Sequence, residues 1–292
     1  MASLRRKLGT AGDLHAVVRT MKAMAASSIG QYENALASLD SYYQAVQMGL
    51  AACLRRQQAP PDAMDGKPAP GATITVIVFG SDQGMVGQFN DAMLAFVLTT
   101  IAPMPGKKIV LAVGERIAAL LAGSALEAGP NFALPMSIRA IAPLVGKLLI
   151  AIERDRATGG HAPVLVFHHR PLPGGAYAPV CQRLLPLDEA WRRGIAALPW
   201  PTKQLPEVLG AMPVTVAAFV NEYLFVTLFR ACAESQASEN ASRLAAMQRA
   251  EKNIDELLGE LNLGYHRLRQ SSIDEELFDL VSGFETLGPR KA

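Results

Sequence analysis

The segment from residue 80 to residue 90 comes nearest to a ligand-binding motif in this sequence. It reads GSDQGMVGQFN, follows a buried apolar run and precedes an amphipathic segment. Loops in this position bind phosphate when the backbone amides of a helix N-terminus face the anion. No Lys-Ser or Lys-Thr pair closes the loop, and Gly80, Gly84 and Gly87 lack the dinucleotide spacing. We therefore interpret it as a tight turn between strand and helix, with nucleotide binding as the alternative.

Histidines and carboxylates elsewhere form no recognisable catalytic or metal-binding pattern. His168 and His169 are adjacent in a predicted strand, so their side chains point to opposite faces and do not easily ligate one metal. An acidic run near the end of the chain is typical of a solvated helix face. That run consists of Asp274, Glu275, Glu276 and Asp279. We predict no catalytic residue, no cofactor and no metal.

The composition is that of a globular protein. The chain has 292 residues, 50% of them hydrophobic, and a formal net charge of only +2, which argues against a nucleic-acid binder. No apolar run approaches the roughly 20 residues of a membrane span, so we expect none. The three cysteines, Cys53, Cys181 and Cys232, are far apart and form no CxxC pair, which excludes the usual zinc and dithiol motifs and fits a reducing compartment.

Both ends of the chain carry a heptad pattern, with a residue suited to a helix seam at alternating steps of three and four. The first seam consists of Leu4, Leu8, Ala11, His15, Val18, Lys22, Ala25, Ile29, Tyr32, Leu36, Leu39, Tyr43, Val46, Leu50 and Cys53. The second consists of Leu209, Met212, Val216, Phe219, Tyr223, Val226, Arg230, Ala233, Ala237, Asn240, Leu244, Met247, Glu251, Ile254, Leu258, Leu261, Tyr265 and Leu268. Such seams require a partner helix, and we predict that these two helices, about 3–56 and 213–287, pair antiparallel.

Polar residues on the second seam indicate how the helix is aligned with its partner. Arg230 and Asn240 stand at seam positions, where polar side chains fix the register or face a partner. Glu239 and Arg243 have the spacing of an i,i+4 ion pair on one helix.

The middle of the chain alternates strand and helix patterns, which predicts a small α/β domain with a mostly parallel sheet. Expected strands are 72–80, 107–113, 163–168 and an edge strand at 177–185; expected helices are 89–101, 115–121 and 135–156. The predicted organisation is therefore an N-terminal helix (1–56), a proline-rich linker (57–71), the α/β domain (72–200) and a C-terminal helix (206–292).

The second long helix is longer than its partner. At 1.5 Å per residue the two helices span about 110 Å and about 80 Å, whereas a domain of about 120 residues is roughly 35 Å across. An apolar stripe continues on the excess length at Ile273, Leu277, Leu280, Phe284 and Leu287. A bare stripe on a single helix is unstable in water. It either folds back on the chain's own domain or enters an apolar sleeve made by another protein.

Four segments, in order, resemble the γ subunit family of F-type ATP synthase. They are RTMKAMAAS (19–27), SDQGMVGQFN (81–90), SENASRLAAMQRAEKN (238–253) and LNLGYHRLRQSSIDEELFDLVSG (261–283). The chain departs from the family pattern at Asp274, where Thr is usual, at Phe284, where a small residue is usual, and at Gln83, where Arg is usual. These departures suggest a divergent branch, such as the alternate bacterial type of the complex.

The resemblance implies a non-catalytic rotor shaft within a ring of α and β subunits. The shaft would stand on the membrane c-ring with an ε-type subunit, on the cytoplasmic face of a bacterial inner membrane, and would couple proton or sodium transport to ATP synthesis. Residues expected to contact partners are Met21, Lys22, Arg243, Gln270, Ile273, Leu277, Leu280 and Phe284, with Ser81, Asp82 and Asn90 facing the foot of the shaft. There are two competing hypotheses for the function. One is a freestanding coiled-coil adaptor, and the other is a nucleotide-binding enzyme built on the α/β domain.

Overall fold

The computed structural model describes residues 2–56, 73–124, 126–159 and 163–287. The chain divides into two compact units, one made of residues 1–24 and 244–292 and the other of residues 25–243. The predicted linker at 57–71 lies outside the described residues. Each unit is described by itself below.

Two long helices carry the predicted seams. Helix α1 spans Ala2–Arg56 and helix α6 spans Met212–Leu287, each within one residue of the predicted ends. Gly210, with φ of 102°, and Pro213 in the first turn mark the start of α6. Leu209 therefore lies before the helix and is 88% exposed, so its assignment to the seam is wrong.

A five-stranded sheet forms the centre of the 25–243 unit. Its strands are β1 (Ile74–Phe79), β2 (Lys108–Val113), β3 (Glu127–Phe132), β4 (Val164–Pro171) and β5 (Tyr177–Leu185). Their order is β3-β2-β1-β4-β5, and every neighbouring pair is parallel except β4 with β5. The mostly parallel sheet and the β5 edge strand are confirmed, whereas β3 was not predicted.

The shorter helices cover the sheet. They are α2 (Phe89–Ile101), α3 (Glu115–Ala122), α4 (Ile141–Gly159) and α5 (Glu189–Ala196), with short 3₁₀ turns η1 (Ile138–Ala140) and η2 (Pro173–Gly175). Helix α4 begins later than predicted because η1 occupies residues 138–140. Helix α5 was not predicted; the Asp188 carboxylate caps it by accepting a hydrogen bond from the Trp191 backbone N–H at 2.9 Å.

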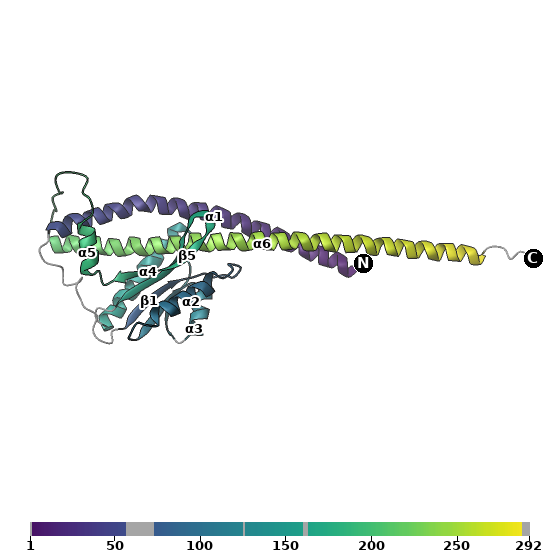
Figure 1. The fold of residues 1–292 in the computed structure, drawn as a ribbon, viewed down its shortest axis with the longest axis horizontal. Helices are drawn as coiled ribbons and strands as arrows, with labels where there is room; N and C mark the ends of the chain where they lie inside the picture. The colour runs from purple at the N-terminus through teal and green to yellow at the C-terminus, as the bar shows by residue number, and fades with distance from the viewer. Residues whose placement is uncertain (1, 57–72, 125, 160–162, 288–292) are drawn as a thin grey trace, which may run out of the picture. The chain divides into compact units, whose positions relative to one another are not determined.

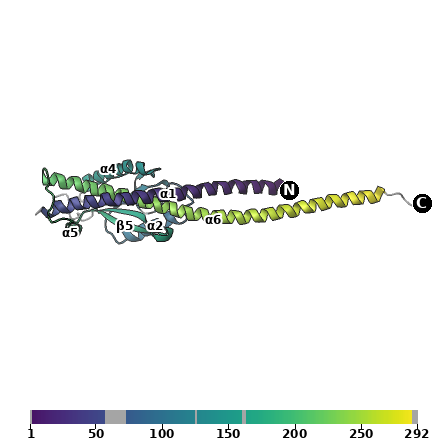
Figure 2. The ribbon, with the colours of Figure 1, turned by 90° about the horizontal axis from the view of Figure 1, so that it is seen from above.

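Two apolar clusters lie on opposite faces of the sheet. One joins strand residues such as Val76 and Val110 to α2 and α3 through Met93 and Ile117. The other joins the opposite strand faces to α4, α6 and the second half of α1, where Leu50 and Leu228 are fully buried. Figure 1 and Figure 2 show the second half of α1 beside the first part of α6.

Seam residues account for the pairing of α1 and α6 within this unit. The Tyr43 and Tyr223 rings lie 5.8 Å apart, and the Trp191 indole N–H donates to the Tyr223 hydroxyl at 3.0 Å. A Cβ on Gly49 would lie 2.3 Å from the Phe219 ring, so the close approach of the helices depends on glycine there. No residue predicted for the seam of α1 is exposed, which confirms that pattern.

Helix α6 contains an 18-residue window with a mean hydropathy of 1.5, long and apolar enough to cross a membrane by length and composition alone. The expectation that no stretch approaches that length is therefore wrong by this criterion. Of that window, 33% is buried in the chain, and core helices of soluble proteins pass the same test, so the window is weak evidence for a span.

Candidate functional site

The glycine-rich loop after β1 is closed by its own side chains. The Ser81 backbone N–H donates to Asn90 Oδ1 at 3.0 Å, and Asn90 Nδ2 donates back to Ser81 Oγ at 2.8 Å. The Asp82 carboxylate accepts from the backbone N–H of Glu115, the first residue of α3, at 2.9 Å. The Asp82 carboxylate is thus the anion at the N-terminus of α3. Ser81 and Asn90 are 0% and 3% exposed, so they shape the loop, and a partner contact here would involve its exposed residues, such as Met85.

The glycine at the start of the loop is required by packing. A Cβ on Gly80 would lie 2.3 Å from Ile117 Cβ and 2.8 Å from Asn90 Oδ1. By contrast, a Cβ on Gly84 would meet nothing within 4 Å. Packing against Ile117 therefore accounts for Gly80 without a phosphate ligand.

A Gly80→Ala substitution should destabilise the protein by about 2 kcal/mol or more, because Ile117 lies in the core and overpacking is costly. Gly84→Ala, the matched control in the same loop, should change the stability by less than about 0.5 kcal/mol. Urea denaturation followed by circular dichroism measures both. Equal midpoints for the two variants would contradict the packing explanation.

Side chains of α6 fill the carboxyl edge of the sheet. Ser242 Oγ donates to the Val86 carbonyl after β1 at 2.5 Å, and Gln236 Nε2 donates to the Pro135 carbonyl after β3 at 3.2 Å. Ser238 Oγ lies 3.3 Å from the His169 carbonyl in β4. Every residue of α6 from 231 to 240 is buried. We call Glu234, Gln236, Ser238 and Ser242 the polar anchor of α6.

The position of the polar anchor matters for function. Open sheets with parallel strands bind ligands in the crevice beyond the carboxyl ends of their strands, where the strand order reverses. In this sheet the order reverses between β1 and β4, and the polar anchor contacts backbone carbonyls in β4 and just after β1. The space that a nucleotide would use is therefore occupied by the chain's own helix.

Glu234 is the buried centre of an ion cluster that joins three segments and extends to the surface. One carboxylate oxygen, Oε2, lies 2.9 Å from His168 Nε2 and 3.3 Å from Arg170 Nε. The other accepts from Arg230 Nε at 2.9 Å, and Arg230 Nη1 reaches Asp40 of α1 at 2.9 Å. Burial alone raises the pKa of Glu234, but hydrogen bonds from His168 and Arg230 outweigh it and lower the pKa to about 2. The polar seam position Arg230 thus pairs within the chain.

His169 lies in an aromatic environment on the other side of the strand. Its ring centroid is 4.2 Å from that of Phe89 and 4.9 Å from that of Tyr177, and neither ring nitrogen has a hydrogen-bond partner in the described part of the chain. Burial, and next the neighbouring His168, lowers the pKa of His169 to about 3. The two histidines face different surroundings, as predicted from their spacing. Among the described residues, no group of three or more His, Cys, Asp or Glu side chains forms a metal site.

Arg243 and Glu239 form the predicted i,i+4 pair. Arg243 Nη2 donates to Glu239 Oε1 at 2.6 Å, and the two side chains are 14% and 6% exposed. Burial raises the pKa of Glu239 against the opposing charge of Arg243. Arg243 Nε is buried without a hydrogen-bond partner among the described residues. Contact of Arg243 with a partner chain stays a prediction.

The unit of residues 1–24 and 244–292 is an antiparallel helix pair. Lys22 Nζ lies 2.5 Å from Glu251 Oε2, and His15 Nε2 lies 3.1 Å from Asp255 Oδ1. A Cβ on Gly264 would lie 3.7 Å from Leu4 Cδ2, so α1 and α6 are close at these two residues. Lys22 is thus engaged within the chain, while Met21 is half-buried.

Beyond this pairing, α6 continues past the start of α1, as Figure 2 shows for this unit. Three residues of the apolar stripe predicted to enter a sleeve are exposed there: Ile273 is 53%, Leu277 59% and Leu280 64% exposed. Gln270 is also exposed, and the side chain of Phe284 lies outside the described residues. Leu268, the last predicted seam residue, is 48% exposed and lies beyond the cover of α1.

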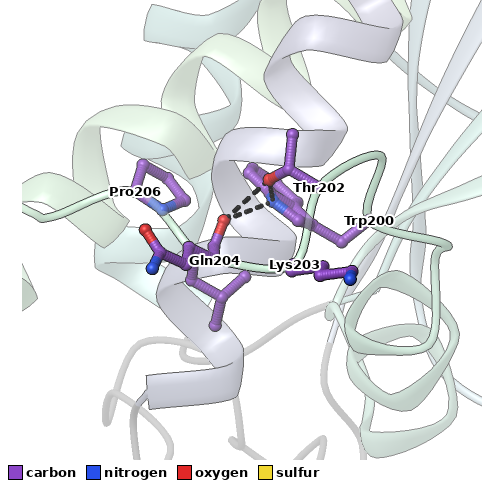
Figure 3. A pocket seen from close by; sticks show the side chains of 6 residues that line it. Trp200, Thr202, Lys203, Gln204 and Pro206 are labelled. Atoms are coloured by element: carbon purple, nitrogen blue, oxygen red, sulfur yellow. Dashed lines mark hydrogen bonds between the residues drawn. The ribbon is translucent and has the colours of Figure 1, made fainter.

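An open hollow in the loop before α6 has no catalytic character. It is lined by residues 200 and 202–206 and shown in Figure 3. The Trp200 indole N–H donates to Thr202 Oγ1 and to the Gln204 carbonyl, both at 2.9 Å. These bonds fold the loop on itself, and Lys203 is the only charged side chain of the lining.

Comparison with known proteins agrees with this arrangement of helices and sheet. The family model described as ATP synthase matches residues 1–287. The chain belongs to the ATP synthase gamma chain family. The gamma chain of Nitrosomonas eutropha is 27% identical over 300 residues, which cover 96% of this chain and 97% of the relative. The gamma chain of Anaeromyxobacter sp. strain K is 24% identical, with 98% and 99% covered.

Solved structures of the family share the fold. A chain of the Euglena gracilis mitochondrial ATP synthase, in a structure of OSCP, F1 and the c-ring, has a TM-score of 0.63 at 17% identity, with 100% of this chain and 97% of that chain covered. A chain of the Tetrahymena thermophila mitochondrial ATP synthase, from the central stalk and c-ring, has a TM-score of 0.56 at 20% identity, with 80% and 99% covered.

Proposed function

We propose that this chain is the central rotor shaft of an F-type ATP synthase and has no catalytic role of its own. Family membership over nearly the whole length supports this role, because the gamma chain relatives are matched from end to end. The one structural observation that favours a shaft most directly is the bare end of α6, where large apolar side chains are exposed beyond Gly264, which lies near Leu4 of α1.

The proposed partners follow from this role. The end of α6 would lie within a ring of α and β subunits, and the α/β domain would contact the c-ring and an ε-type subunit at the cytoplasmic face of a bacterial inner membrane. A single asymmetric helix pair presents a different surface to each surrounding subunit as it rotates. Differential contact with the open and closed states of those subunits shifts their equilibrium, which is what coupling requires.

A nucleotide-binding enzyme is the weaker alternative. Its binding site would lie at the carboxyl edge of the sheet, where the polar anchor of α6 already fills the space. The Gly80 loop is likewise closed by the Ser81–Asn90 pair and by Asp82. The chain's own side chains thus already bind the Ser81 and Glu115 backbone amides at this loop.

Co-purification tests the shaft role against a freestanding adaptor. We expect a tagged full-length chain, co-expressed with the α and β subunits of its source, to retain both subunits. Removing residues 273–292 should weaken this retention about tenfold or more, because it deletes the exposed apolar contact area, and should leave partial ATPase activity in the remaining complex. A full-length chain that purifies alone as a well-behaved monomer or dimer would instead support the adaptor.

A further inference from the structure

The exposed end of α6 carries an apolar surface wider than a seam. Five large side chains that are each more than half exposed lie within 273–281: Ile273, Leu277, Phe278, Leu280 and Val281. At about 100° per residue, they occupy an arc of roughly 160° around the helix. We call this surface the tip arc.

The tip arc is not a continuation of the seam that faces α1. Ile254, Leu258 and Leu261 are half-buried in the helix pair, and the centre of the stripe at Ile273, Leu277 and Leu280 is rotated from them by about 100°. A second helix that extended the same seam, including one from another copy of this chain, would therefore leave much of the tip arc bare. The cover must be a surface of different shape, such as a collar that surrounds the helix.

One carboxylate interrupts the tip arc. On the same helical projection, Asp274 falls between Val281 and Phe278, one turn after the exposed Gln270. Asp274 has no ion pair or hydrogen bond in the part of the chain that the structure describes. The other carboxylates of the acidic run, Glu275, Glu276 and Asp279, project to the opposite side of the helix, where they remain in water.

A carboxylate within an enclosed apolar surface is costly unless a cation faces it. We propose that the collar that covers the tip arc is an apolar socket with one Lys or Arg side chain opposite Asp274. This inference rests on the proposed function, since the socket belongs to the ring of α and β subunits. It adds a specific charge pair, which would select cognate subunits against those whose socket is uncharged there.

The test uses the full chain co-expressed with its α and β subunits. Asp274→Leu replaces the carboxylate by an apolar group of similar size, and Asp279→Leu makes the same change on the opposite side of the same helix. With a cation in the socket, Asp274→Leu leaves that cation unpaired and should speed dissociation from the complex about tenfold or more. Asp279→Leu should change the dissociation rate by less than about twofold. Circular dichroism should show the same helicity in both variants.

Three results would overturn the inference. If Asp274→Leu dissociates at the wild-type rate or more slowly, the socket is apolar throughout, although the shaft role stands. If both variants dissociate equally fast, the effect is not specific to the tip arc. If the unsubstituted chain does not retain α and β and instead forms a concentration-dependent dimer in sedimentation, the shaft role fails as well, so the two failures are distinguishable.

Discussion

Acidification from pH 7 to pH 5 should destabilise this protein through His169. Folding lowers the pKa of this imidazole from its ordinary 6.5 to about 3, because the ring is buried between Phe89 and Tyr177 without a polar partner. The unfolded chain therefore binds a proton at His169 that the folded chain does not. The stabilisation is complete above about pH 6.5 and is lost as the pH falls toward 3, by at most about 1.4 kcal/mol per pH unit.

The matched variant is His169→Phe, which keeps an aromatic ring in the same packing and removes the titration. Urea midpoints measured between pH 7.5 and pH 5 should fall less steeply for His169→Phe than for the unsubstituted chain. His266→Phe, on the exposed part of α6, should follow the unsubstituted chain. This pH range lies above the window between 4.5 and about 2 in which Glu234 titrates, so its contribution does not interfere. Parallel curves for all three proteins would rule out the role of His169.

Loss of the Glu234 carboxylate should be the most damaging change in the ion cluster. Glu234→Leu leaves His168 and Arg230 without their shared acceptor and should cost about 3 kcal/mol, the lower end for a broken buried pair, because both arginines of the cluster reach water. Asp40→Asn removes only the exposed end of the same network and should cost less than about 1 kcal/mol.

Thermal unfolding of the two variants, each compared with the unsubstituted chain, separates these expectations. If Asp40→Asn lowers the melting temperature as much as Glu234→Leu does, the cluster stabilises the protein mainly through its link to α1. No drop for Glu234→Leu would mean that apolar packing replaces the ions without cost, as happens in some buried networks.

The sequence predicts the long helices and the central strands well because their signals are strong. The α1 seam repeats from Leu4 to Cys53, and the β1 run ITVIVF is mostly apolar and rich in β-branched residues, as a strand buried on both faces should be. In these elements the spacing of apolar residues in the sequence matches the positions that the fold buries.

The elements that were missed have weak or opposing local signals. Strand β3 reads EAGPNF and contains both glycine and proline, which disfavour strands. Its glycine is required by tertiary contact, since a Cβ on Gly129 would lie 2.9 Å from the Val110 carbonyl. Helix α5 has eight residues, too few for a clear periodic pattern, although its Asp188 cap was a readable signal.

The polar anchor could not have been found from the sequence. Its residues are polar or charged, so hydropathy predicts an exposed face, yet the whole segment 231–240 is buried. Its burial depends on backbone carbonyls in or just after three different strands, brought together only by the fold. The candidate contacts at Ile273, Leu277 and Leu280 were predictable because an uncovered apolar stripe is visible in the sequence itself.

The ion pair between Asp40 and Arg230 joins two helices that are synthesised far apart in time. These two residues are 190 positions apart, so α1 waits for its helical neighbour until most of the protein has left the ribosome. At roughly 5–20 residues per second, that delay is about 10 to 40 s. During most of it, the apolar face around Leu50 has no α6 to cover it, and the nascent polypeptide is open to aggregation or chaperone capture.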